Sequence, residues 1–213
     1  MFKLLRIDSS PLGSDASFSR ELTAEFVQHW PQTHPGGEVV SRDLATTQLP
    51  QVTAEWIGAV YTPEAALTAR QREVLAISDE LIAELYDADE YVFGVPMHNF
   101  SIPASLKLWI DQIVRLGKTV SYENGTPAGL LRGKKATFLV ASGGVYDAGT
   151  PQASLNFIEP YLRAVFGFIG VADTTFVNAG GTAKSLYGVA RGHILQPALE
   201  AIRGQFQSMA SPA

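Results

Sequence analysis

Short runs of β-branched and aromatic residues alternate with amphipathic segments along the whole chain of 213 residues. Five of these runs favour strands, at residues 2–7, 38–44, 90–95, 136–140 and 171–177. Such alternation of strand and helix is typical of a parallel sheet covered by helices on both faces. We therefore predict an α/β protein of three layers, with a single domain over residues 1–213. Five strands fit the order 2-1-3-4-5, which is common in this class.

The helical segments are marked by apolar side chains that recur every three or four residues. Thr68 is a candidate cap for a helix that runs to about Tyr86, and Pro103 stands where the next helix begins, which runs to about Leu116. Pro197 falls inside the last helix, so we expect a kink or a break there. The remaining helical stripes are expected at 20–30, 155–166 and 195–206.

The composition narrows the chemistry that is open to the chain. It has no cysteine, which excludes disulfides, thiolate nucleophiles and cysteine-held metal centres. Redox chemistry would therefore need a bound organic cofactor or a metal held by other ligands. The formal net charge of -5 disfavours a nucleic-acid partner. No apolar run approaches the length of a membrane span, and the first residues enter a strand directly, so we expect a cytoplasmic protein with no membrane partner.

The loop after the first strand is rich in serine. Residues 9–20 carry five serines and lead into a helix, and hydroxyl groups beside the free N–H groups of a helix start suit a phosphate dianion. Ordinary N-capping by Ser17 or Ser19 is the alternative. The loop has neither the P-loop pattern nor the G-x-G-x-x-G pattern, which disfavours ATP hydrolysis and NAD as a tightly held cofactor.

The loops after the third and fourth strands have features of ligand sites. Met97 and Phe100 offer apolar contact to a planar ring, and the Asn99 amide offers both a donor and an acceptor. A structural turn between two prolines is the alternative. Gly143 and Gly144 let a backbone approach a ligand closely, although paired glycines also form simple tight turns. The carboxyl ends of parallel strands meet at one edge, so we expect the three loops to converge.

These motifs together resemble those of the FMN-dependent NADH-azoreductases, a family of flavodoxin-like quinone reductases. Ser17-Phe18-Ser19 resembles the family's phosphate loop, and Met97-His98-Asn99-Phe100 resembles the loop around its flavin ring. The resemblance covers nearly the whole chain and implies one flavodoxin-like domain that binds FMN tightly and holds no metal. The cofactor-binding residues that it implies are Ser10, Ser17, Phe18, Ser19, Pro96, Met97, His98, Asn99, Phe100, Ala141, Ser142, Gly143 and Gly144.

The resemblance also implies the reaction. NADH would give a hydride to the flavin and leave, and a quinone or an azo compound would then take two electrons in a ping-pong cycle. Planar quinones and azo dyes make similar demands on a pocket, so both acceptor classes stay open. Tyr122 and Phe168 correspond to aromatics that line the family's substrate pocket, with packing inside the protein as the alternative. No side chain is assigned as an obligatory acid or base.

Two residues depart from the family pattern. His98 stands where the family has tyrosine, and Ser142 stands where it has arginine. We expect both to change substrate choice more than flavin binding. Because histidine changes charge near neutral pH, His98 is a candidate proton donor to a reduced quinone, with an exposed side chain of no catalytic duty as the alternative. No arginine cluster suited to a 2′-phosphate is identifiable, which favours NADH over NADPH.

The segment between the second strand and the following helix carries Trp56, Ile57, Val60 and Tyr61 outside the regular alternation. Exposed apolar surface commonly marks an interface, and the family forms homodimers with sites at the subunit boundary, so we expect a homodimer. Three alternatives to a quinone or azo reductase stay open. They are a flavodoxin-type electron carrier, a flavin or chromate reductase on the same fold, and a scaffold without catalysis.

Overall fold

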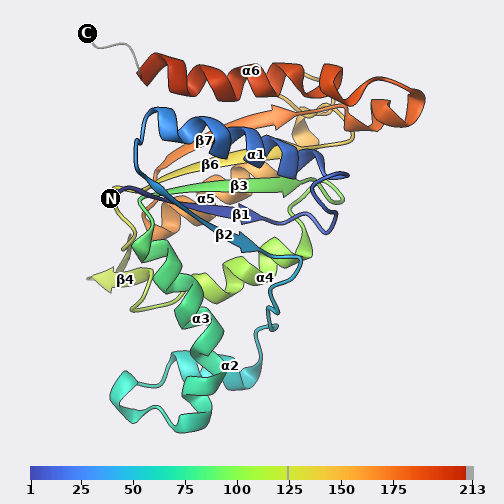
Figure 1. The fold of residues 1–213 in the computed structure, drawn as a ribbon. Helices are drawn as coiled ribbons and strands as arrows, with labels where there is room; N and C mark the ends of the chain where they lie inside the picture. The colour runs from blue at the N-terminus through green and yellow to red at the C-terminus, as the bar shows by residue number, and fades with distance from the viewer. Residues whose placement is uncertain (124, 210–213) are drawn as a thin grey trace.

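The computed structural model describes residues 1–123 and 125–209, and its centre is a parallel sheet of five strands (Figure 1). The strands are β1 (Lys3–Asp8), β2 (Glu38–Asp43), β3 (Glu90–Pro96), β6 (Lys135–Ala141) and β7 (Asp173–Ala179). Their order is β2-β1-β3-β6-β7, and every neighbouring pair is parallel. Numbered along the chain, these are the five predicted strands in the order 2-1-3-4-5, so the predicted fold class and strand order are confirmed.

Helices cover both faces of the sheet, as the alternation predicts. One face carries α1 (Phe18–His29) and α6 (Arg191–Met209), and the other carries α3 (Ala69–Asp87), α4 (Ala104–Ile113) and α5 (Ile158–Ile169) (Figure 1). The shorter elements are η1 (Trp30–Gln32), α2 (Ala54–Val60), η2 (Glu64–Ala66), η3 (Ala153–Leu155), η4 (Thr182–Tyr187) and the antiparallel hairpin of β4 (Val120–Glu123) with β5 (Thr126–Gly129), which the sequence did not predict.

The larger core is built around aromatic side chains on the face that α4 and α5 cover. Phe93 on β3 pairs in register with Phe138 on β6, and their rings stack at 4.9 Å. Phe166 of α5 packs edge-on against both rings, at 5.2 and 4.9 Å, and Trp109 of α4 packs edge-on against Phe93 at 5.5 Å. All four side chains are fully buried. Because burial of aromatic area is a large stabilising contribution, this cluster holds the middle strands and so fixes their carboxyl ends.

Local hydrogen bonds explain where two helices begin and end. Thr68 caps α3 with a full capping box to Gln71, as predicted. Helix α4 starts after Pro103 as predicted, but it ends at Ile113 and not at Leu116. Thr119 causes the early end, because its hydroxyl accepts from the Arg115 N–H at 3.0 Å and donates to the Ile113 carbonyl at 2.6 Å.

Two other helices differ from the prediction. Leu155 lies in η3 and not in α5, because the Asn156 side chain accepts from the N–H groups of Ile158 and Glu159 at 3.1 and 3.3 Å and so starts a new helix. Of the kink or break expected at Pro197, the break is absent, since α6 is continuous through this residue. Packing on α1 and β7 through Leu195, Ala198, Ile202 and Phe206 stabilises both halves of α6 against the loss of one backbone hydrogen bond.

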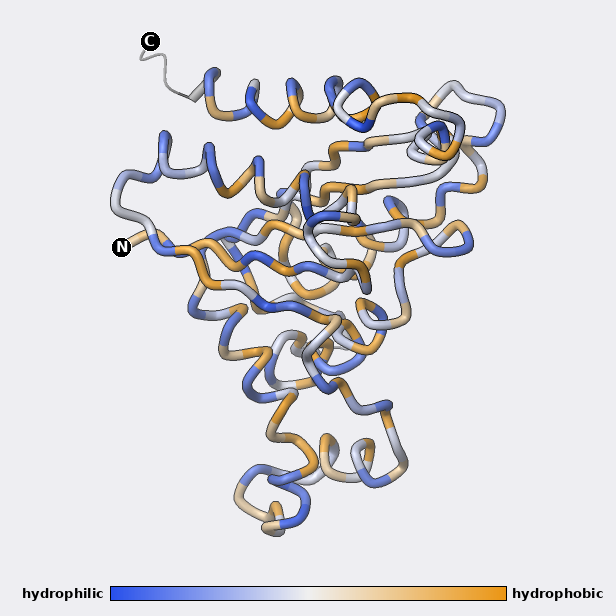
Figure 2. Tube along the Cα trace, turned by 45° about the vertical axis from the view of Figure 1, so that its right-hand side comes forward, coloured by the Kyte–Doolittle hydropathy of each residue, from blue (hydrophilic) through white to orange (hydrophobic). Residues whose placement is uncertain are grey.

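The segment that connects β2 to α3 forms an arm that projects from the body of the protein (Figures 1 and 2). Helix α2 packs on the start of α3 through Trp56, Ala59 and Leu75. The expectation that Trp56 is exposed is therefore wrong, since only 8% of its surface is accessible. Ile57 and Tyr61, on the outer side of the arm, are 47% and 72% exposed.

Candidate functional site

The loops that follow β1, β3 and β6 meet around one cavity at the carboxyl edge of the sheet. Open parallel sheets commonly bind ligands at the carboxyl ends of their strands, at the switch point where the strand order reverses. The cavity has a volume of about 150 Å³. Its lining residues are Ser10, Pro11, Leu12, Ala16, Ser17, Phe18, Ser19, Pro96, Met97, His98, Ala141, Gly143 and Thr182.

The serine loop presents buried hydroxyl groups to this cavity. Ser10, Ser17 and Ser19 are each at most 2% exposed, and all three line it. Ser17 is also the N-cap of α1, since its Oγ accepts from the Arg20 N–H at 3.3 Å, and the Ser17 and Ser19 hydroxyl oxygens lie 3.2 Å apart. Capping and ligand binding are compatible here, because the first N–H groups of a helix have no partner within the helix.

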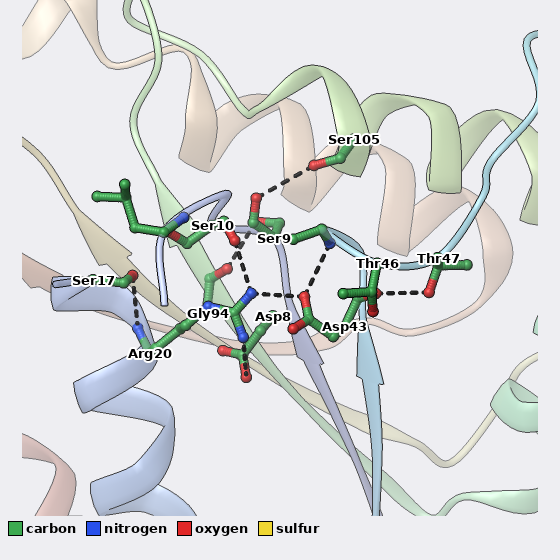
Figure 3. Close-up of polar contacts among 12 residues, drawn as sticks. Asp8, Ser9, Ser10, Ser17, Arg20, Asp43, Thr46, Thr47, Gly94 and Ser105 are labelled. Atoms are coloured by element: carbon green, nitrogen blue, oxygen red, sulfur yellow. Dashed lines mark hydrogen bonds and ion pairs between the residues drawn. The ribbon is translucent and has the colours of Figure 1, made fainter. Parts of the chain in front are cut away.

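An arginine that the sequence analysis missed lies beneath the serine loop (Figure 3). The Arg20 guanidinium donates from Nη2 to the Ser10 carbonyl at 2.8 Å and to Oδ1 of Asp43 at 2.6 Å, and Nη1 lies 3.9 Å from Asp8. Arg20 thereby connects the loop after β1 to the end of β2. A cation in the first turn of a helix opposes the helix dipole, and this position was the signal that carboxylates lie nearby.

The pKa values of Asp8 and Asp43 are shifted in opposite directions. Burial raises the pKa of Asp8 above its usual value of 3.8, against the lowering effects of Arg6, Thr23 and Arg20. The hydrogen bond from Arg20 lowers the pKa of Asp43. Asp43 is therefore the firmly ionised partner of Arg20, while Asp8 is held in a poorly solvated place beside Thr23, whose hydroxyl donates to it at 2.8 Å.

Gly94 on β3 allows the serine loop to approach the sheet. A Cβ at this position would lie 2.6 Å from Oδ1 of Asp8 and 3.1 Å from the Ser19 carbonyl oxygen, closer than side chains tolerate. The Gly94 carbonyl accepts from both the N–H and the hydroxyl of Ser9, at 3.1 and 2.8 Å (Figure 3). The Ser105 hydroxyl donates to the Ser9 carbonyl at 3.3 Å, which joins α4 to the same loop.

The loop after β3 is a tight turn in a strained conformation. The N–H of Met97 donates to the Ala141 carbonyl at 2.8 Å, and His98 and Ser101 exchange two backbone hydrogen bonds of 2.9 and 3.0 Å. Asn99 and Phe100 have positive φ values of 48° and 70°, a region that residues other than glycine seldom adopt. Strain of this kind clusters at ligand sites, and here both side chains are exposed and do not line the cavity.

In the loop after β6, a tyrosine of the same loop covers one of the two glycines. A Cβ on Gly144 would lie 2.8 Å from the Tyr146 hydroxyl, so the tyrosine ring covers this glycine. The same ring meets Phe100 edge-on at 6.0 Å, which joins the second and third loops. Tyr146 and Thr182 are contributions that the sequence analysis missed. Ser142 lines a smaller cavity beside the main one, and its hydroxyl donates to the Gly144 carbonyl at 3.0 Å.

The structure does not bring the two predicted substrate residues to the cavity of the same chain. Tyr122 lies on β4, and Phe168 lies in the last turn of α5, both at the amino edge of the sheet (Figure 1). The Leu131 N–H donates to the Ile169 carbonyl at 2.9 Å, which ties the end of β5 to the end of α5. Both rings are exposed, at 57% and 39%, so packing inside this chain does not account for them either.

The described residues show neither a metal-binding cluster nor a membrane-spanning helix. In residues 1–123 and 125–209, no group of three or more histidine, aspartate or glutamate residues is arranged to hold a metal ion. Over the same ranges, no helix has the length and apolar character that crossing a membrane requires.

Curated relatives match this chain over nearly its whole length. The family model described as a flavodoxin-like fold matches residues 2–205. An FMN-dependent NADH:quinone oxidoreductase of Acidobacterium capsulatum is 54% identical over 204 residues, which make up 95% of this chain and 98% of that protein. FMN-dependent NADH:quinone oxidoreductase 3 of Burkholderia lata is 50% identical over 97% of this chain and 100% of its own length.

Solved structures match the backbone equally well. An azoreductase from Bacillus anthracis superimposes with a TM-score of 0.86 at 28% identity, covering 98% of this chain and 100% of its own. An FMN-dependent NADH-azoreductase from the same species, solved in complex with FMN, has a TM-score of 0.86 at 25% identity and covers 99% of this chain and 100% of its own.

Proposed function

Because this chain belongs to the family of the flavodoxin-like fold, we propose that it is an FMN-dependent NADH:quinone oxidoreductase that also reduces azo compounds. The observation that carries the proposal is the cavity at the carboxyl edge of the sheet, which residues of all three predicted loops line. Relatives of 54% and 50% identity are FMN-dependent NADH:quinone oxidoreductases by name, and the reduction of azo compounds is supported by the similar azoreductase structures.

The residues around the cavity fit FMN. Three buried hydroxyl groups and the free N–H groups at the start of α1 would hold the phosphate, since a helix start favours an anion. The backbones of Pro96, Met97, Ala141 and Gly143 would flank the ring system. When bound, FMN accepts a hydride from NADH and passes two electrons to the acceptor, so the protein needs to supply binding, orientation and electrostatics.

The chain's own residues would orient the acceptor at the mouth of the cavity. The bond from the Met97 N–H to the Ala141 carbonyl fixes the edges of the two ring loops, and the turn between His98 and Ser101 holds Asn99 and Phe100 outward. An exposed Phe100 braced by Tyr146 offers a flat face to a planar quinone or azo compound. His98, exposed on the same loop, would supply a proton to the reduced product.

We propose NADH as the donor and the cytoplasm as the site of action. The residues that line the cavity include neither lysine nor arginine, and a 2′-phosphate is commonly met by arginine, so NADPH has no evident partner at this site. NADH is a product of cytoplasmic metabolism, which supports that location for an enzyme that consumes it.

We also propose a homodimer with two sites at its subunit boundary. Tyr122 and Phe168 lie at the opposite edge of the sheet from the cavity, so only a second copy of the chain could place them over a bound flavin. The exposed Ile57 and Tyr61 on the arm supply apolar surface for such a contact. Light scattering at micromolar concentration should give twice the mass of the 23.0 kDa chain.

A negative charge on the arm should dissociate the proposed dimer without unfolding its subunits. Ile57→Glu should give a monomer that retains FMN but loses quinone turnover, because each site would lack its partner's aromatics. Leu186→Glu, at a side chain that is 82% exposed on η4, is the matched control and should leave the mass unchanged. A wild-type monomer at these concentrations would contradict the proposed dimer.

The proposed activity is tested by visible absorption spectroscopy of the purified protein with added FMN. NADH is added without oxygen, and a benzoquinone follows. The expected result is a yellow protein that bleaches with NADH and recovers its colour with the quinone. FMN that binds but does not respond to NADH would indicate an electron carrier, and turnover only with free flavin as acceptor would indicate a flavin reductase. A protein that does not bind FMN would overturn the proposed function.

A further inference from the structure

The side chain of Arg191, the first residue of α6, reaches across to the serine loop. Its Nη1 donates to the Ala16 carbonyl at 3.1 Å, and its Nε donates to Oε2 of Glu21 at 2.5 Å. The guanidinium carbon lies 3.9 Å from the centre of the Phe18 ring, which is cation–π geometry. The Arg191 side chain therefore contacts the serine loop at Ala16 and the first turn of α1 at Phe18 and Glu21.

These contacts act on residues that form the cavity. Ala16 and Phe18 both line it, while Arg191 lies outside its lining. Arg191 thus touches the outer side of Phe18 and leaves the cavity free. Arg191 therefore packs behind residues that line the cavity.

The supported loop has few other attachments. Residues 11–16 are all exposed, and the hydrogen bonds from the Ala16 and Ser17 N–H groups go to Gly13 within the same loop. The Leu12 N–H donates to Ser10, again within the loop. Among the hydrogen bonds of the described residues, the Arg191–Ala16 bond is the one that ties residues 11–16 to a distant element.

The Arg191 guanidinium also keeps one donor unused. Its Nη2 is buried and has no hydrogen-bond partner among the described residues. Nε donates to Glu21 and Nη1 donates to Ala16, so a fork of two hydrogen bonds holds the cation beside the loop. An ordered loop and a fixed cation both favour binding of an anion, because less ordering remains to be done when the ligand arrives.

We propose that Arg191 is a positioning residue for the phosphate of FMN, holding Ala16 and Phe18 in the arrangement that forms the phosphate end of the cavity. This inference rests on the proposed cofactor. It couples the start of α6, more than 170 residues from the loop in sequence, to cofactor affinity. A residue that only joins α6 to α1 would stabilise the protein without distinguishing one flavin from another.

The chain offers a matched control for that distinction. Arg203, farther along α6, donates to Glu25 of α1 at 2.5 Å, so it forms the same type of pair between the same two helices. No hydrogen bond or ion pair of Arg203 among the described residues involves the serine loop. Arg203→Met therefore removes an arginine–glutamate contact between α6 and α1 and leaves the loop contacts in place.

The experiment measures the Kd of FMN and of riboflavin for the wild-type apoprotein, Arg191→Met and Arg203→Met by flavin fluorescence. Riboflavin lacks the phosphate, so it reports on the ring loops alone. Arg191→Met should raise the Kd for FMN about tenfold, the loss expected from one charge-assisted contact of ~1.4 kcal/mol. It should leave the Kd for riboflavin unchanged, and Arg203→Met should change neither.

Several results would overturn the inference. Arg191→Met could bind FMN as tightly as Arg203→Met, or it could lose riboflavin and FMN affinity equally, which would indicate a general structural role. Wild-type protein that binds no FMN would remove the proposed function and the inference together, a result distinct from the first two. Arg191→Lys serves if the methionine variant does not fold. It keeps the charge but loses the fork, so its Kd for FMN should exceed that of wild type, and an unchanged Kd would contradict the role.

Discussion

The indole Nε1 of Trp56 donates a hydrogen bond to Oε1 of Gln112 at 2.9 Å, although the two residues lie 56 positions apart. The Gln112 amide nitrogen donates in turn to the Pro50 carbonyl at 3.0 Å. Gln112 is fully buried, so both ends of its side-chain amide are satisfied by residues of the arm. The arm is therefore fastened to α4, and exposed residues such as Ile57 and Tyr61 are presented from a rigid base.

Trp56→Phe should lower the free energy of unfolding by about 1–3 kcal/mol, because Gln112 would keep a buried acceptor without its donor. Urea unfolding of the apoprotein measures the change. The same substitution made in a Gln112→Met background is the control, since no acceptor is left unpaired there, and it should cost less. Equal costs in the two backgrounds would contradict the importance of this hydrogen bond.

Gly94→Ala should destabilise the apoprotein by about 1–3 kcal/mol, the usual cost of forcing a methyl group into a closely packed site. The new Cβ would lie 2.6 Å from Oδ1 of Asp8 and 3.1 Å from the Ser19 carbonyl oxygen, so Asp8 and the start of α1 would have to move away from β3. Gly204→Ala is the matched control, since it lies in α6 and a methyl group there would meet no atom within 4 Å. That change should stabilise the protein by about 0.5–1 kcal/mol, as alanine does in a helix. Thermal unfolding should give a lower Tm than wild type for Gly94→Ala and a higher Tm for Gly204→Ala, and a Tm for Gly94→Ala that equals that of wild type would contradict the close packing at this position.

The inner strands β1, β3 and β6 could be predicted from the sequence because they are largely buried on both faces. Such strands read as continuous apolar runs, as in Tyr91 to Val95, and they stand out between polar helix surfaces. The cap at Thr68 was equally visible, because a capping box depends on residues three positions apart. The three loops that line the cavity could be located because each directly follows a recognisable strand.

Contacts between residues that lie far apart in the sequence could not be predicted from local patterns. Nothing near Trp56 in the sequence indicates that Gln112 would bury it, and nothing near Phe18 indicates that Arg191 would cover its ring. The positions of Tyr122 and Phe168 at the far edge of the sheet depend on the short hairpin, whose strands of four residues give little periodic signal. Local rules locate elements, whereas the contacts between elements decide which side chains face the cavity.

Asp43→Asn should lower the free energy of unfolding near neutral pH, by at most about 1 kcal/mol because the carboxylate is 38% exposed. The hydrogen bond from Arg20 lowers the pKa of Asp43 in the folded protein below the usual value of 3.8. Its contribution is therefore fully present above that value and is lost as the pH falls through the lowered pKa. Urea unfolding at several pH values should show the two proteins converge in acid. A difference that persists at about pH 2 would show that the ion pair is not its source.

His98→Tyr should keep FMN and change the pH profile of quinone turnover. The turn holds through backbone bonds between His98 and Ser101, so the new side chain leaves the loop in place. An imidazole and a phenol exchange protons in different parts of the range from about pH 5 to 11, so the dependence of the rate on pH should change. Steady-state kcat across that range measures it, with FMN content checked by absorbance. Because His98 is exposed and donates no hydrogen bond from its ring among the described residues, stability should not change. A profile identical to that of the wild type would reject the role of proton donor, and the loss of FMN would mean that the imidazole holds the flavin itself.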